Sequence, residues 1–190
     1  PHFNLKMNMG RYSLAMKKKV VILGSTGSIG QQTLDVIRSH PDHFEVVSLV
    51  ARTNISKLRE QYREFKPARV IITEPGIRVP DRDIPVKYGM EYVLEEVQRD
   101  DVDVVVNAFS GIAGLMPTYT SLRHGKRVAL ANKETLVTGG KLVMDACRLG
   151  GVELITLDSE HSAVLQCLQG ESRSNIAKII LTASGGPFRT

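Results

Sequence analysis

The sequence has few of the residues that serve redox motifs, base stacking and membrane insertion. It contains no tryptophan, 5% aromatic residues and two cysteines. Cys147 and Cys167 lie in helix-like segments without C-x-x-C spacing, which indicates reduced thiols in a cytoplasmic protein; a single disulfide is the less favoured alternative. No apolar run reaches the ~20 residues that a membrane span needs. We therefore expect a protein that enters no membrane.

The main part of the chain also lacks an excess of basic residues. The formal net charge is +5, and five basic residues precede the first acidic one, Asp35: Lys6, Arg11, Lys17, Lys18 and Lys19. The remainder is balanced in charge, which argues against a nucleic-acid partner. The chain begins with Pro1, and Met16 stands just before an apolar strand, so we expect residues 1–15 to be a vector-derived leader outside the fold.

A short apolar strand that runs into a glycine turn is the most informative feature of this sequence. Residues 20–30 read VVILGSTGSIG, with Gly24, Gly27 and Gly30 at every third position, and a helix-like pattern follows. Glycines let a ligand approach the backbone, and the first N–H groups of the helix attract an anion. The spacing differs from the commoner G-x-G-x-x-G motif, and glycines that serve packing alone are the alternative. We favour a turn that binds a nucleotide phosphate.

Short β-rich runs alternate with helical stretches after this turn. We expect strands over 45–51, 69–73, 102–106, 127–131 and 152–156. Several are apolar on both faces, as is typical of parallel strands buried between two layers of helices. The pattern predicts the α/β class, with a doubly wound, Rossmann-like parallel sheet over residues 16–157.

Two segments depart from this alternation. Residues 74–89 contain three prolines and predict a surface excursion before a helix near 90–98. From residue 158 the pattern changes to a helix over 162–168, a polar loop and a strand over 176–181. We interpret residues 158–190 as the incomplete start of a second, α+β domain, and the chain as a fragment of a longer protein.

The residues that follow the second expected strand indicate whether the nucleotide is NAD or NADP. In such sheets ligands bind at the carboxyl ends of the strands, and NAD-binding proteins carry an acid about 20 residues beyond the glycines. Arg52 lies 22 residues beyond Gly30 and is followed by Thr53 and Asn54. A cation here suits the 2′-phosphate of NADP better than NAD. A surface arginine beside a helix cap at Asn54 is compatible with the same residues.

Two further loops follow strands in the same way. Residues 107–111, NAFSG, are small enough to approach a flat ring, although an ordinary loop is an equal alternative. Asn132, Lys133 and Glu134 open the next helix. A lysine in the first turn opposes the helix dipole at a cost of roughly 0.3–1 kcal/mol. Its presence there therefore suggests that it binds an anionic or carbonyl-bearing partner. The alternative is a solvated lysine beside a capping glutamate.

The last strand of the expected sheet ends in an acidic motif, Asp158-Ser159-Glu160-His161. If the backbone is still extended, Asp158 and Glu160 project to the same side. Two such carboxylates suit Mg²⁺ or Mn²⁺. Asp158 as a helix cap, with Glu160 favouring the positive end of the helix, is the alternative, and His161 is interpreted as structural.

Four motifs together resemble a known family. GSTGSIGQQTLDVIR, NKETLVTGGKL, LDSEHSAVLQ and TASGGPFR occur in the order and spacing of 1-deoxy-D-xylulose 5-phosphate reductoisomerases, from Lys17 to the end of the chain. The resemblance implies an enzyme that rearranges 1-deoxy-D-xylulose 5-phosphate and reduces the product with NADPH, giving 2-C-methyl-D-erythritol 4-phosphate for isoprenoid synthesis. It also implies a divalent metal, a sugar-phosphate substrate and a homodimer of full-length chains.

The resemblance also assigns site residues by position. Gly24 belongs to the glycine turn, Lys133 and Glu160 are the residues we expect to be catalytic, and Asp158 and Glu160 are expected to bind the metal. Lys133, Ser159, Glu160 and Ser184 are expected to contact the substrate. The remaining residues would bind NADPH: Thr26, Gly27, Ser28 and Ile29 at the pyrophosphate, Arg52, Thr53 and Asn54 at the adenosine phosphate, and Asn132 and Glu134 on the nicotinamide side.

The chemistry suits these residues, but the chain ends before the family's pattern does. A chelated metal acts as a Lewis acid during the rearrangement, and NADPH supplies the hydride. The family's third metal-binding glutamate and its C-terminal helical domain lie beyond the last motif, so we expect the fragment alone to be inactive. Alternatives are another NADP-dependent reductase, of the dihydrodipicolinate reductase type, or a non-catalytic dinucleotide sensor.

Overall fold

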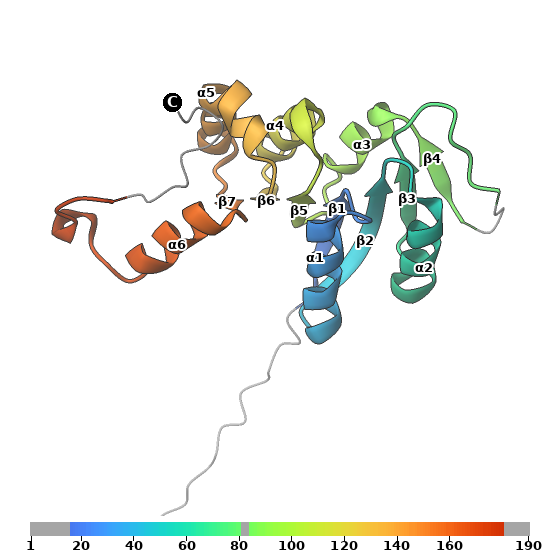
Figure 1. Ribbon diagram of the computed structural model, residues 1–190, viewed down its shortest axis with the longest axis horizontal. Coiled ribbons are helices and arrows are strands. Elements are labelled where there is room, and N and C mark those ends of the chain that lie inside the picture. The colour runs from blue at the N-terminus through green and yellow to red at the C-terminus, as the bar shows by residue number, and fades with distance from the viewer. Residues whose placement is uncertain (1–15, 81–83, 181–190) are drawn as a thin grey trace, which may run out of the picture.

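The computed structural model describes residues 16–80 and 84–180, which form a parallel sheet with helices on both faces (Figure 1). The seven strands are β1 (Lys18–Leu23), β2 (Phe44–Ala51), β3 (Arg69–Ile72), β4 (Val86–Tyr88), β5 (Val104–Asn107), β6 (Arg127–Leu130) and β7 (Leu154–Thr156). Their order is β4-β3-β2-β1-β5-β6-β7, and each neighbouring pair is parallel. The predicted α/β class and doubly wound sheet are confirmed.

The helices form two layers, because successive residues of each strand point to opposite faces. On one face, Val20 and Ile22 of β1 pack with apolar residues of α1 (Ser28–Ser39) and α2 (Ile55–Phe65). On the other face, Val21 and Leu23 belong to a cluster that includes residues of α3 (Met90–Glu96), α4 (Leu115–Arg123) and α5 (Lys133–Gly150). Both faces of the strands are therefore buried, as their continuous apolar runs predicted.

The order of the strands reverses between β1 and β5. The chain winds from β1 through β2 and β3 to β4 on one side, then returns to place β5 on the other side of β1. Loops that leave the carboxyl ends of β1 and β5 consequently diverge and leave a crevice between them. The topology thus predicts the ligand site beside the glycine turn.

The excursion expected over residues 74–89 contains a strand that the sequence analysis missed. β4 is three residues long, follows Pro85, and pairs with β3 at the edge of the sheet. Its proline and brevity gave no strand pattern, and pairing with β3 decides its conformation. The helix that follows ends at Glu96, two residues before the expected end.

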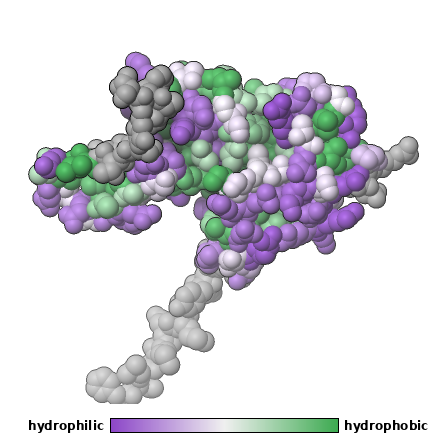
Figure 2. Space-filling view, viewed as in Figure 1, coloured by the Kyte–Doolittle hydropathy of each residue, from purple (hydrophilic) through white to green (hydrophobic). Residues whose placement is uncertain are grey.

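The last part of the described chain differs more from expectation. Helix α6 (Ser159–Leu168) begins three residues before the predicted start, because Asp158 caps it. Residues 176–180, expected to begin a strand, have no strand assignment; a strand requires a partner, and no described strand pairs with them. No residue of α6 is buried, and Figure 2 shows apolar residues on the surface of the lobe that carries it.

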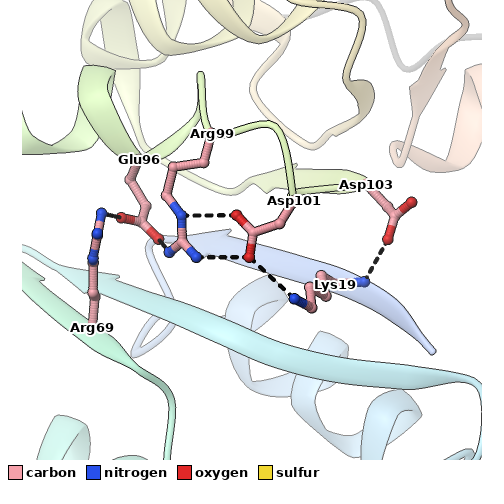
Figure 3. A network of polar contacts seen from close by, with 6 residues as sticks. All are labelled: Lys19, Arg69, Glu96, Arg99, Asp101 and Asp103. Atoms are coloured by element: carbon pink, nitrogen blue, oxygen red, sulfur yellow. Dashed lines mark hydrogen bonds and ion pairs between the residues drawn. The ribbon is translucent and has the colours of Figure 1, made fainter. Parts of the chain in front are cut away.

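A network of charged groups lies at the amino ends of the strands, the end of the sheet away from the crevice (Figure 3). The Glu96 carboxylate is 1% exposed and accepts hydrogen bonds from Arg69 (2.8 Å) and Arg99 (2.6 Å). Arg99 also pairs with Asp101, which contacts Lys19 of β1. The network joins α3 to the starts of β1 and β3, and it lies away from the crevice.

Candidate functional site

The glycine turn has the backbone shape that a phosphate site requires, although its three glycines serve different purposes. Gly24 has φ of +82°, and a Cβ there would lie 2.6 Å from the Ala108 carbonyl oxygen. A Cβ on Gly30 would lie 2.3 Å from the Gly24 carbonyl oxygen. A Cβ on Gly27 would meet one atom, at an ordinary 3.4 Å. Packing therefore explains Gly24 and Gly30, whereas Gly27 is left open toward a ligand.

A cleft of about 420 Å³ lies over this turn at the carboxyl ends of β1, β2, β3 and β5. It is the crevice that the strand order predicts. Its lining comprises Gly24, Thr26, Gly27, Arg52, Thr73, Glu74, Met90, Ala108, Phe109, Ser110 and Ala113. The predicted residues Gly24, Thr26, Gly27 and Arg52 thus meet in one cavity.

The start of α1 faces this region without a side-chain cap. Gly27 is the N-cap and supplies no side chain, whereas Asn54, Asn132 and Asp158 cap α2, α5 and α6. The first N–H groups of a helix have no partner within it, so they remain available to an anion. Ser28 and Ile29 form the first turn, as expected from the sequence.

The residues after β2 divide between two roles. The Asn54 side-chain oxygen accepts a hydrogen bond from the Lys57 N–H (3.0 Å), so the expected helix cap is confirmed. Arg52 instead lines the cleft, and its Nε donates to the Glu74 carboxylate at 2.6 Å. Thr53 is exposed between them. Of the three, Arg52 is the one whose charge lies at the cleft.

Asn132 is positioned differently from a ligand-binding side chain. It is 3% exposed; its amide nitrogen donates to the carbonyl oxygens of Phe109 (2.7 Å) and Gly111 (2.6 Å). Its side-chain oxygen accepts from the N–H and hydroxyl of Thr135. These four contacts use both N–H donors and both acceptor positions of the side-chain amide, so none is left for a ligand. Asn132 therefore shapes the loop that carries Phe109 and Ser110 of the cleft.

Lys133 and Glu134 begin α5 as predicted, and both are exposed. The charge of Lys133 reaches Asp158 and Glu160 at the start of α6 and favours their ionised forms. This effect of Lys133 is the smallest of those that act on the two carboxyl groups, so Lys133 lies within electrostatic range of them without forming an ion pair.

Asp158 and Glu160 lie at the first turn of a helix and not on an extended strand. Partial desolvation raises the pKa of Asp158, but the backbone and ring N–H groups of His161 and the charge of Lys133 outweigh it and lower the pKa. The hydroxyl of Ser159 donates to Glu160 (2.8 Å), which lowers the pKa of that carboxyl group. The alternative, in which Asp158 caps the helix, is confirmed, and the extended backbone is wrong because the helix begins at Ser159.

The acidic motif does not share the cleft of the glycine turn. Ser159 and Glu160 line a separate cavity of about 560 Å³, with apolar residues of α6 and of the segment 176–180. Among the described residues, no three His, Cys, Asp or Glu side chains are grouped as a metal site. Ser184 lies outside the described residues.

The sequence analysis missed the contribution of β3 to the cleft. Thr73 and Glu74 follow β3 directly, and Met90 begins the next helix. The rule that ligands bind at the carboxyl ends of strands, applied to β3 as it was to β2, would have identified Thr73 and Glu74.

The family model described as 1-deoxy-D-xylulose 5-phosphate reductoisomerase matches residues 20–140, and the model of the C-terminal domain of that enzyme matches residues 154–190. The chain belongs to the 1-deoxy-D-xylulose 5-phosphate reductoisomerase family. The reductoisomerase of Thermoanaerobacter pseudethanolicus is 49% identical over 177 residues, which cover 90% of this chain and 46% of that protein. The chain thus spans about half the length of the curated relatives it matches. Membership excludes the dihydrodipicolinate reductase alternative.

Two solved structures of reductoisomerases are also similar. The enzyme from Zymomonas mobilis in complex with NADPH superposes with a TM-score of 0.81 at 38% identity, covering 92% of this chain and 47% of that one. A reductoisomerase in complex with magnesium gives a TM-score of 0.72 at 35% identity, covering 80% and 40%. The fold and the order of the motifs are therefore those of the reductoisomerase family.

Proposed function

We propose that this chain provides the NADPH-binding region, residues 16–157, and the first part of the catalytic region, residues 158–190, of a 1-deoxy-D-xylulose 5-phosphate reductoisomerase. The enzyme would convert 1-deoxy-D-xylulose 5-phosphate to 2-C-methyl-D-erythritol 4-phosphate. The single observation that carries the proposal is the cleft in which the glycine turn, with Gly27 open to a ligand, meets the side chain of Arg52. Relatives that match the same residues bear this enzyme's name.

The cleft fits a dinucleotide with an added phosphate. Thr26, Gly27, Ser28 and Ile29 would hold the pyrophosphate through backbone N–H groups at the start of α1. Arg52 would bind the 2′-phosphate, with Thr53 and the amide of Asn54 beside it. The exposed guanidinium of Arg52 at the mouth of the cleft supports NADPH over NADH.

The nicotinamide would lie toward the loop after β5. Phe109 and Ser110 line the cleft there, and Asn132 holds their loop from beneath. We propose that Asn132 acts on the nicotinamide position through this loop, with Glu134 at the adjoining end of α5. NADPH, when bound, supplies the hydride that reduces the rearranged substrate.

The acidic motif would hold the metal and the substrate. Asp158 and Glu160 offer the oxygen donors that Mg²⁺ or Mn²⁺ prefers, and Ser159 lies between them. The metal, when bound, polarises the carbonyl oxygen of the substrate. Lys133, whose charge reaches both carboxylates, would bind the substrate's oxygen atoms and neutralise charge that develops there. We propose Lys133 and Glu160 as catalytic residues, and Ser184 as a ligand of the substrate's phosphate.

Replacement of Gly27 by alanine tests nucleotide binding without breaking the turn. The new methyl group meets no atom closer than 3.4 Å, and the backbone φ of −77° is ordinary, so the protein should fold. The methyl group would occupy the space where the pyrophosphate approaches, so NADPH affinity should fall at least about tenfold, or roughly 1.4 kcal/mol. Calorimetric titration of the 190-residue chain measures it.

Gly140→Ala is the matched control, because a Cβ at Gly140 meets nothing within 4 Å and this glycine lies within α5, away from the cleft. It should leave NADPH affinity unchanged. Equal NADPH affinity in the wild-type chain and the Gly27→Ala variant would refute the site.

The catalytic assignment is tested in the full-length protein. Glu160→Gln removes a metal-binding carboxylate and should abolish most of the reductoisomerase rate while NADPH affinity persists. A sensor without catalysis would show no rate in the wild type. Full activity in the Glu160→Gln variant would contradict the role of Glu160.

We further propose that the full-length protein is a cytoplasmic homodimer that accepts Mn²⁺ as well as Mg²⁺. Both cysteines are free thiols, which is typical of a reducing compartment. None of the helices in the described ranges has the length and apolar character needed to cross a bilayer. Apolar side chains on α5, including Val137 at 85% exposure, are of the kind that oligomerisation covers. Sedimentation of the full-length protein tests the dimer.

A further inference from the structure

Glu74 stands in the cleft where the sequence analysis found no acid. NAD-binding proteins carry this acid after the second strand, where the present chain has Arg52. The next strand of the sheet is β3, and Glu74 follows its carboxyl end. The Glu74 carboxylate accepts a hydrogen bond from Arg52 Nε at 2.6 Å. The two side chains, 77% and 35% exposed, share the lining of the cleft with Gly27.

The ion pair with Glu74 uses only part of the hydrogen-bonding capacity of Arg52. A guanidinium has five N–H donors, and the contact with Glu74 uses the one on Nε. Within the described residues, the remaining donors, on the two Nη atoms, have no ion-pair partner. A 2′-phosphate can therefore reach Arg52, but it arrives beside a carboxylate that already neutralises the charge of Arg52.

Building on the proposed function, we propose that Glu74 is a specificity-determining residue that weakens the preference of this cleft for NADPH over NADH. The 2′-phosphate is close to a dianion at neutral pH, so the Glu74 carboxylate repels it and competes with it for Arg52. NADH carries a 2′-hydroxyl instead, which can donate a hydrogen bond to the Glu74 carboxylate where the phosphate would be repelled. Arg52 and Glu74 thus act on the same ribose in opposite directions.

The ion pair between Arg52 and Glu74 is exposed, so its removal should disturb the folded structure little. Exposed ion pairs contribute little to folding stability, so loss of the Glu74 charge should leave the protein folded. Nucleotide selectivity can therefore be measured apart from stability.

The test is calorimetric titration of the 190-residue chain with NADPH and with NADH, in the wild type and in Glu74→Gln. The ratio of the NADH dissociation constant to the NADPH dissociation constant should rise about three- to tenfold in the variant, because one exposed charge is removed beside the phosphate. Glu153→Gln is the matched control, because Glu153 forms an exposed ion pair with Arg127 at the amino ends of β6 and β7, away from the cleft. It should leave the ratio unchanged.

A second variant tests whether the effect passes through Arg52. In an Arg52→Gln background the phosphate has lost its cation, so Glu74→Gln should change the ratio by less than it does alone. A wild-type chain that binds neither nucleotide overturns the proposed function and this inference together. A wild-type chain that binds both, with a ratio that stays constant or falls in Glu74→Gln, overturns the inference alone.

Discussion

Asn107 and Asn132, at the carboxyl ends of the adjacent strands β5 and β6, turn their side-chain amides onto the same loop. Asn107 donates to the Gly114 carbonyl oxygen (2.8 Å), and Asn132 donates to those of Phe109 and Gly111. A Cβ on Gly114 would lie 3.1 Å and 2.7 Å from the two amide nitrogens. The loop after β5, whose residues Phe109 and Ser110 line the cleft, is therefore fixed by two buried asparagines.

Asn132→Ala should destabilise the protein more than the loss of a helix cap alone. It removes the cap of α5 and leaves two loop carbonyls and the Thr135 N–H without their partner. We expect a loss of about 2–4 kcal/mol in the free energy of unfolding, measured by urea denaturation.

Asn54→Ala is the control for Asn132→Ala, because Asn54 is an exposed cap whose side-chain oxygen accepts one backbone hydrogen bond. It should cost about 1 kcal/mol. Equal losses in the two variants would show that the contacts of Asn132 with the loop contribute nothing.

Gly30→Ala should destabilise the fold severely. An added Cβ lies 2.3 Å from the Gly24 carbonyl oxygen and 2.6 Å from Ser25 Cα, and these backbone atoms cannot move without opening the turn. We expect at least about 3 kcal/mol of lost stability, measured by thermal unfolding. A Gly30→Ala variant as stable as Gly27→Ala would contradict the packing role of Gly30.

Glu96→Ala should disrupt the charged network at the amino ends of the strands. Removal of the buried carboxylate leaves Arg69 and Arg99 without the acid that accepts their hydrogen bonds (Figure 3). We expect a loss of about 3 kcal/mol in the free energy of unfolding, with unchanged NADPH affinity because the network lies away from the cleft. Glu95→Ala, at an exposed neighbouring position, should change stability by less than about 0.5 kcal/mol.

Acid should loosen the start of α6. The pKa of Asp158 is lowered in the folded state, so its stabilising contribution is complete above the ordinary value of 3.8 and is lost as the pH falls through the lower folded value. Hydrogen exchange at the His161 amide, which donates to Asp158, should therefore gain protection as the pH rises through this range, after correction for intrinsic exchange.

Asp158→Asn retains a capping oxygen without a titrating group, so the acid dependence at the His161 amide should disappear. Persistence of the same dependence in this variant would assign it to another group.

The local pattern of the sequence determined the sheet, the glycine turn and the caps at Asn54 and Asp158. Buried parallel strands need apolar residues on both faces, and a tight turn between a strand and a helix needs glycines at fixed positions, so these features follow from neighbours in the chain. The motifs from Lys17 onward likewise identified the family, which the match over residues 20–140 confirmed.

The tertiary structure decided which residues meet across strands. β4 is a strand because β3 offers it an edge, and Glu74 reaches Arg52 because β2 and β3 are neighbours in the sheet. Asn132 was expected at the nicotinamide, but its hydrogen bonds bind the loop after β5, which lies 21 to 23 residues earlier. Such contacts depend on strand order and on the space left after packing, and no short stretch of sequence encodes either.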